Sequence, residues 1–270
     1  MSPYLIRQHQ PFQDGYTRIT TIGEETHDTG IHFGILKLKA NEHYIIYGPL
    51  ESAYVLLNGQ CYWTTQQGQI ETKRASLFDE GPIALHLASQ SRAEIKALTA
   101  CEFAVVQVVN AGSFPTTLYQ KENLLETEYR GKGLLDDTAC RIVRTVFDKR
   151  NSPQSNLVLG EVITQPGRWS SYPPHHHVQP EIYHYRFTEP NGFGFAECGH
   201  DVFKVRENDT YKILNSNDHA QTSAPGYGMY YLWMIRHLEN QPYLVPEFTE
   251  DHAWTKSKEA NKRSWKGTIK

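Results

Sequence analysis

Short runs of alternating or continuous apolar residues, each ended by turn residues, dominate the hydrophobic pattern of this chain. The runs are rich in β-branched and aromatic side chains, which pack well on a pleated surface and therefore predict β-strands. The predicted strands span residues 31–40, 52–57, 60–65, 94–98, 103–109, 157–163, 181–187, 193–198, 211–214 and 229–235.

Turn and helix signals agree with a β-protein. Two Asn-Gly pairs, Asn58-Gly59 and Asn191-Gly192, lie between predicted strands and are typical of hairpin turns. Helical patterns are scarce, with candidates only near residues 123–129 and in the charged tail after Asp251. Many short strands at this spacing predict an all-β sandwich or barrel.

The two halves of the chain resemble each other in order. Residues 52–59 parallel residues 181–192, and residues 92–106 parallel residues 219–233. An internal repeat of this kind predicts two copies of one β-barrel. We therefore expect an N-terminal barrel over residues 1–128, a linker over 129–140, and a C-terminal barrel over 141–270.

The candidate chemistry lies in the second half. His175 and His177 are two residues apart, so on a strand their side chains point to one face while His176 points away. Glu181 opens the next predicted strand, and His219 follows further along the chain. Neutral imidazole and carboxylate are the usual ligands of Zn²⁺, Mn²⁺ or Fe²⁺. The pattern predicts one divalent metal ion per chain, although an exposed histidine-rich loop stays open as an alternative.

The first half lacks these ligands. On the internal repeat, the four candidate ligands correspond to Ile46, Gly48, Ser52 and Arg92. Aliphatic, glycine and arginine residues do not bind metals through their side chains, and serine does so poorly. We therefore expect the N-terminal barrel to be metal-free and structural.

Charge and cysteine content exclude several classes of partner. The 27 basic and 30 acidic residues give a net charge of −3, so there is no basic footprint for nucleic acid or an anionic membrane. Residues 1–7 contain no apolar core of signal-peptide length, and no later run approaches the roughly 18 apolar residues of a spanning helix, so we expect neither a signal peptide nor a membrane span. Its four cysteines are widely spaced, which favours free thiols in a reducing compartment and a cytoplasmic location.

The His-x-His, Glu and later His resemble the two sequence motifs of the cupin superfamily. The longer strings 160–162, 169–175, 181–187, 224–227 and 251–254 are similar to the family of bicupin 5-deoxy-glucuronate isomerases of bacterial inositol catabolism. The uronate isomerases of pectin breakdown are more distant relatives. The resemblance implies an all-β bicupin, with two cupin-type antiparallel β-barrels (double-stranded β-helices) in one chain.

The same resemblance implies a function. It would be metal-dependent conversion of an aldose acid to a ketose acid, here 5-deoxy-D-glucuronate to 5-dehydro-2-deoxy-D-gluconate in myo-inositol degradation. The metal, held by His175, His177, Glu181 and His219, would act as a Lewis acid on a small sugar-acid substrate. A cupin dioxygenase and a non-catalytic sugar-binding cupin stay open as alternatives, as does a homo-oligomer.

Proton transfer between adjacent carbons needs a general base. The sequence offers Tyr183, Glu161 and Lys212 as catalytic candidates. Each has a plainer alternative. Tyr183 could be a barrel-filling aromatic, Glu161 a buried hydrogen-bonded acid, and Lys212 an exposed surface lysine.

Three further residues are candidates for contacts with the substrate. Arg168 could bind a carboxylate, because the planar guanidinium group matches it with two parallel bonds. Tyr185 shares the strand face of Glu181 and could line the cavity. His252 could reach back to the site from the C-terminal segment, with a surface position as its alternative.

The second cupin motif departs from the family pattern. Asn208 stands where a glycine usually precedes the strand, and Asn217 where a glycine usually precedes the histidine. The loop ahead of Glu181 is also shorter than in typical members. These departures leave the ligands in place and bear on the substrate preference.

Overall fold

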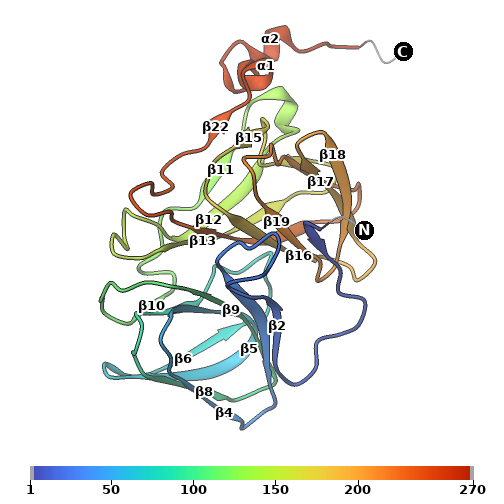
Figure 1. Ribbon diagram of the computed structural model, residues 1–270. Coiled ribbons are helices and arrows are strands. Elements are labelled where there is room, and N and C mark those ends of the chain that lie inside the picture. The colour runs from blue at the N-terminus through green and yellow to red at the C-terminus, as the bar shows by residue number, and fades with distance from the viewer. Residues whose placement is uncertain (1–2, 268–270) are drawn as a thin grey trace.

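The computed structural model describes residues 3–267 and is built almost wholly of antiparallel β-strands. Figure 1 shows two stacked barrels, one from the blue-to-green first half and one from the green-to-red second half, with short helices at the far end of the second.

The first barrel contains a sheet with the strand order β10-β7-β5-β9-β3-β2, extended by β4, β6 and β8. Its strands are β2 (Gly15–Thr20), β3 (His32–Leu38), β4 (His43–Ile46), β5 (Glu51–Thr65), β6 (Gly68–Arg74), β7 (Ala84–Leu87), β8 (Ala93–Ala97), β9 (Cys101–Val108) and β10 (Thr117–Tyr119).

The second barrel has a sheet with the order β1-β19-β16-β21-β13-β12-β11, a smaller sheet β14-β20-β17-β18, and the pair β15-β22. Its strands are β1 (Leu5–Ile6), β11 (Glu128–Arg130), β12 (Arg141–Phe147), β13 (Leu157–Thr164), β14 (Trp169–Ser170), β15 (His175–His176), β16 (Glu181–Phe187), β17 (Phe193–Cys198), β18 (Asp201–Arg206), β19 (Thr210–Ile213), β20 (Gln221–Ser223), β21 (Met229–Arg236) and β22 (Glu247–Phe248). The helical elements are η1 (Leu135–Asp137), α1 (Glu250–Ala253), η2 (Trp254–Lys256) and α2 (Ala260–Arg263).

The two large sheets repeat one topology. The order β7-β5-β9-β3-β2 matches β19-β16-β21-β13-β12, strand for strand. The register matches as well, since Ser52 lies opposite Leu87 where Glu181 lies opposite Ile213, each at the last residue of the partner strand. The edge strand is exchanged, because β1 from the start of the chain pairs with β19 where β10 pairs with β7. In Figure 1 the dark blue start of the chain accordingly lies beside the second barrel.

The core joins the barrels into one body. Strand alternation sends Tyr54 and Leu56 into the interior of the first barrel, while Ala53 and Val55 face the second. A single apolar cluster contains these outward residues together with Leu157, Leu159 and Ile182 of the second barrel. Because burial of this shared apolar surface stabilises both halves, we expect them to unfold together.

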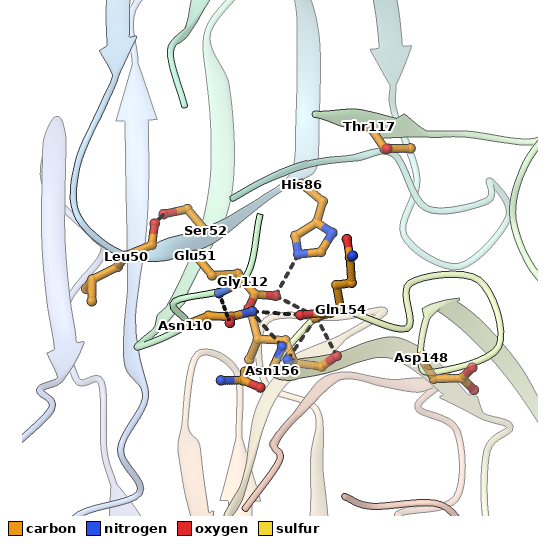
Figure 2. A network of polar contacts seen from close by, with 12 residues as sticks. Leu50, Glu51, Ser52, His86, Asn110, Gly112, Thr117, Asp148, Gln154 and Asn156 are labelled. Atoms are coloured by element: carbon orange, nitrogen blue, oxygen red, sulfur yellow. Dashed lines mark hydrogen bonds and ion pairs between the residues drawn. The ribbon is translucent and has the colours of Figure 1, made fainter. Parts of the chain in front are cut away.

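A buried polar network also crosses the interface (Figure 2). The fully buried carboxylate of Glu51 accepts hydrogen bonds from His86 Nε2 (2.7 Å), Asn110 Nδ2 (2.6 Å), Ser155 Oγ (2.5 Å) and the backbone N–H of Asn156 (2.8 Å). Burial by itself raises the pKa of Glu51, but the bonds from His86, Ser155 and Asn156 outweigh it and lower the pKa below its ordinary value. The ionised carboxylate therefore ties the two barrels together.

The prediction of a hairpin at Asn58-Gly59 is wrong. Residues 51–65 form one continuous strand, which pairs with β7 and β9 before Gly59 and with β6 and β8 after it. Gly59 has φ +113°, and a Cβ there would lie 2.6 Å from both Ala100 O and Cys101 Sγ. Glycine is needed because the strand crosses between sheets at this close approach.

Asn191-Gly192 does form a turn, between β16 and β17, but these strands pair with other neighbours, so it is not a hairpin either. The helix expected near residues 123–129 is absent, and residues 128–130 form strand β11 instead. The helical tail after Asp251 is confirmed as the short elements α1, η2 and α2.

One departure from the family pattern, at Asn208, has a simple local explanation. Asn208 has φ +66°, a left-handed conformation that asparagine tolerates, so it can replace the usual glycine ahead of β19.

All four cysteines are free and buried, as expected. Among residues 3–267, no helix is long and apolar enough to cross a membrane.

Candidate metal centre and its cavity

A cavity of about 650 Å³ lies against the inner face of the second barrel. Strands β12, β13, β16 and β21 form one side of it through residues such as Val143, Val162, Tyr183 and Tyr231. Residues 128–139 and 243–256 supply the other walls. The segment that the sequence predicts as a linker therefore covers a cavity.

His177, Glu181 and His219 form the one cluster of three metal-binding residue types among the described residues. Their ligand atoms lie within 4.8 Å of one another, and all three side chains are buried. His177 Nε2 and His219 Nε2 lie 3.1 and 3.4 Å from the same oxygen, Oε2 of Glu181. The sequence prediction placed all three residues in one metal site.

Backbone contacts fix the orientation of the rings. His177 Nδ1 is 2.9 Å from Gln179 O, and His219 Nδ1 is 2.9 Å from Asn217 O. A carbonyl can only accept, so each Nδ1 carries the proton and each neutral ring presents a bare Nε2. This is the usual arrangement of metal-bound histidine, in which the second ring nitrogen is hydrogen-bonded to an outer group.

The ligand atoms of this cluster face one another with no hydrogen-bond donor between them. His219 Nε2 is buried and has no hydrogen-bond partner. In this tautomer, both Nε2 atoms and Oε2 of Glu181 are acceptors that face one another. A divalent cation between them would relieve this repulsion, so the residues present fit a metal ion.

His175 stands at the edge of the cluster. Its ring centroid is 4.4 Å from that of His219, and its Nδ1 is 3.2 Å from Pro173 O, which again leaves Nε2 bare. It lines the cavity but does not belong to the three-residue cluster. His176 points away, as predicted, with Nδ1 2.9 Å from Asp218 Oδ1.

Burial keeps the rings neutral. Desolvation is the main cause that lowers the pKa of both His175 and His219 to about 3, and His177 contributes to the lowering in each case. Neutral imidazole is the form that binds metal, so the burial favours ligation at physiological pH.

Two tyrosines and a serine lie beside the cluster. Ser171 Oγ is 3.2 Å from Tyr183 Oη and 3.0 Å from Tyr231 Oη, and all three residues line the cavity. Burial raises the pKa of Tyr183 well above 10, and the charge of Glu181 raises it further. Tyr183 is therefore a protonated phenol, suited to donate a hydrogen bond. Sequence analysis missed Ser171 and Tyr231, which no periodic pattern marks.

Glu161 does not line the cavity. It faces the first barrel, where Arg74 Nη1 and Nη2 donate to it at 2.7 and 2.8 Å and Tyr230 Oη donates at 2.9 Å. The structure therefore shows the buried hydrogen-bonded acid and corrects the catalytic assignment.

The catalytic assignment of Lys212 is corrected for the same reason. It lies on β19 opposite Ile182, on the face turned to the first barrel, and its Nζ forms an ion pair with Glu24. It is buried rather than exposed, so neither of the two sequence-based alternatives holds.

The three predicted substrate contacts also lie outside the cavity lining. Tyr185 fills the barrel interior, where its hydroxyl donates to Gln221 Oε1 at 2.6 Å. Arg168 is half-buried in the loop before β14, and His252 is exposed on α1. The structure does not bring these side chains to the metal cluster.

A model of the KduI/IolB family matches residues 4–255 of the chain. A relative from Geobacillus thermodenitrificans (strain NG80-2), named 5-deoxy-glucuronate isomerase, is 26% identical over 251 residues, which cover 86% of this chain and 89% of that protein.

Solved structures agree on the fold. An IolB-like protein from Salmonella typhimurium LT2 superposes with a TM-score of 0.83 at 22% identity, over 95% of this chain and 100% of that one. The oxalate decarboxylase of Lactobacillus farciminis, in its formate complex, gives 0.66 at 12% identity, over 92% and 89%. The predicted all-β, cupin-type fold is thereby confirmed.

Proposed function

The chain belongs to the KduI/IolB family, and from this premise we propose that it is a metal-dependent isomerase that converts 5-deoxy-D-glucuronate to 5-dehydro-2-deoxy-D-gluconate in myo-inositol degradation. The observation that carries the proposal is the convergence of His177 Nε2 and His219 Nε2 on one oxygen of Glu181 beside a cavity. Nitrogen and oxygen ligands of this kind accept Zn²⁺, Mn²⁺ or Fe²⁺.

His177, Glu181 and His219 would hold the ion, with His175 beside them as the fourth ligand. When bound, such an ion supplies Lewis-acid polarisation of a carbonyl oxygen and its neighbouring hydroxyl. The apolar side chains of Val143 and Val162 form part of the cavity wall.

The protein also supplies proton donors. Tyr183 and Tyr231 keep their phenolic protons, since burial raises the pKa of both, to about 12 for Tyr231. Ser171 bridges their hydroxyl groups and can pass a proton between them. Of the three catalytic candidates predicted from sequence, Tyr183 is the one that this arrangement supports.

The experiment assays the purified protein, both with and without oxygen, on 5-deoxy-D-glucuronate and on the pectin-derived 5-keto-4-deoxyuronate. We expect turnover of the former without nicotinamide, loss on chelation and recovery with a divalent ion. His176→Ala is the matched control for His177→Ala, since His176 points to Asp218 instead of the cluster. No turnover of either sugar acid, with oxygen consumed on another substrate, would replace this proposal with the dioxygenase.

The proposed function also implies a substrate class and a location in the cell. We propose a small sugar acid as the substrate and a cytoplasmic location, in keeping with four free thiols. Assembly into a homo-oligomer remains to be measured by light scattering.

A further inference from the structure

The cavity contains more positive than negative side chains. Its cations are Arg130, Arg141, Lys149, Arg150 and Lys256. Two of them are neutralised by a neighbouring carboxylate. Arg130 donates to both oxygens of Glu128 at 2.9 Å, and Arg150 forms an ion pair with Asp148 at 2.7 Å.

Two more have other partners. Lys149 Nζ donates to the carbonyl oxygens of Pro153 and Ser155, at 2.9 and 2.6 Å. Lys256 Nζ lies 3.3 Å from the ring centroid of Phe248, a cation–π contact.

Arg141 is the exception. Its exposed fraction is 9%, and within the described part of the chain its side chain forms one hydrogen bond, from Nη1 to Ala139 O at 2.9 Å. Within residues 3–267 no carboxylate forms an ion pair with it. Its remaining donors are not enclosed by protein, so within the cavity they are available to an anion that accepts two parallel hydrogen bonds.

A second observation also favours an anion at this position. Arg130 lies directly opposite Arg141 in the antiparallel pair β11–β12, and both side chains line the cavity. Like charges at directly opposite positions repel each other. Glu128, which pairs with Arg130, supplies one negative charge against these two positive ones, so a net positive charge remains beside the cavity.

Arg141 is also held in place and close to the metal cluster. A Cβ on Gly131 would lie 2.5 Å from Ala139 O and 3.3 Å from Arg141 Nη1, so the backbone packs tightly around the head group. Arg141 and His175 line the same cavity.

We propose that Arg141 binds the carboxylate of the sugar-acid substrate and so orients the opposite end of the open chain toward His177, Glu181 and His219. This inference rests on the proposed function for the identity of the substrate. Arginine suits the role because its planar fork forms two parallel bonds with a carboxylate. Arg168, which the sequence suggested for this task, lies outside the cavity lining.

The test compares an acid with its neutral counterpart. In steady-state assays, Arg141→Gln should raise the KM for 5-deoxy-D-glucuronate by about 100-fold or more, because it removes one partner of a desolvated charge pair. It should also abolish the preference over 5-deoxy-D-glucose, which carries a hydroxymethyl group in place of the carboxylate. Metal content should not change. Arg150→Gln, an equal charge change at a solvent-exposed position paired with Asp148, should leave the preference intact.

Calorimetry makes the test independent of turnover. The unreactive linear acid D-gluconate should bind the wild type more tightly than neutral D-glucitol, and Arg141→Gln should lose this difference. If the wild type shows the difference but isomerises no uronic acid, the proposed function fails and the carboxylate site stands.

If the wild type turns over the uronic acid and Arg141→Gln keeps the preference for acids, the inference about Arg141 is overturned. Arg141→Lys serves as a second variant should the glutamine variant not fold. It keeps the charge but loses the two-pronged geometry, so an intermediate preference is expected, and an unchanged one would contradict the proposal.

Discussion

Arg74 of the first barrel donates two hydrogen bonds to Glu161 of the second, at 2.7 and 2.8 Å, and both side chains are fully buried. Arg144 lies 3.9 Å from the same carboxylate. The two barrels therefore share an enclosed ion pair in addition to their apolar cluster, and that pair has no access to water that could replace a lost partner.

Glu161→Gln should destabilise the protein by about 3–5 kcal/mol, because it leaves the buried Arg74 charge without compensation. The free energy of unfolding would be measured by urea titration with tryptophan fluorescence. Glu259→Gln, which removes an exposed pair with Lys262, should cost less than about 1 kcal/mol. Equal effects of the two substitutions would mean that Glu161 is not enclosed in solution.

His177→Ala should lower the bound metal from about one ion per chain to a small fraction of that, while His176→Ala should retain it. The reason is that His177 faces Glu181 and His219, whereas His176 points away from them to Asp218. Elemental analysis measures the content directly. In thermal melts, free ion at about 100 times its Kd should stabilise the wild type by about 2.7 kcal/mol and leave His177→Ala unchanged. A value near two ions per chain would contradict a metal-free first barrel.

Acid should weaken the fold partly through His237. Its Nδ1 accepts a hydrogen bond from the backbone N–H of Tyr243 at 2.9 Å, and burial lowers its pKa to about 4. Because the folded pKa lies below the ordinary 6.5, the unfolded chain binds the proton first as the pH falls. The stabilisation is complete above pH 6.5 and is lost progressively as the pH approaches 4.

His237→Asn keeps an acceptor and cannot titrate, so its free energy of unfolding should fall less steeply across this interval in metal-free protein. Urea titrations at several pH values would compare it with the wild type. His200→Asn, at an exposed position, is the control. Parallel curves for His237→Asn and the wild type would rule out His237 as a source of the acid sensitivity.

Gly59→Ala should cost about 3 kcal/mol or more, since it combines a positive φ with a contact of 2.6 Å to Ala100 O. Gly68→Ala measures the cost of a positive φ alone, because Gly68 has φ +123° but nothing lies within 4 Å of the added Cβ. We expect about 1–2 kcal/mol there. A similar loss at both positions, measured by chemical denaturation, would show that the crossing of β5 tolerates a side chain.

The strands and the clustering of His177, Glu181 and His219 could be predicted because each has a local signal. The bounds of β16 and β17 coincide with the predicted runs, and the spacing of His175 and His177 set His176 apart from the cluster. The orientation of Glu161 could not be predicted in the same way. Every residue of β13 is buried, so that strand has no polar face to show which side is the interior.

The residues that form the cavity walls could not be predicted from the sequence, for another reason. Residues 128–139 and 243–256 have no apolar period, and their position depends on contacts with distant strands. Arg141 opens β12, and nothing in the sequence indicates that Arg130 lies opposite it. The repeat was also informative only in part. Glu51 precedes the equivalent of Glu181 by one residue, which turns its carboxylate to the interface instead of the interior.

Because of the edge strand β1, the two barrels have all their strands available at different times during synthesis. Every strand of the first large sheet is complete once Tyr119 has left the ribosome, whereas Leu5 must wait for Tyr211. At roughly 5–20 residues per second, about 200 further residues take on the order of 10–40 s. Throughout that time Leu5 and Ile6 lack their partner strand, so the barrel that contains the candidate metal centre completes its sheet last, with a strand that was synthesised before either barrel.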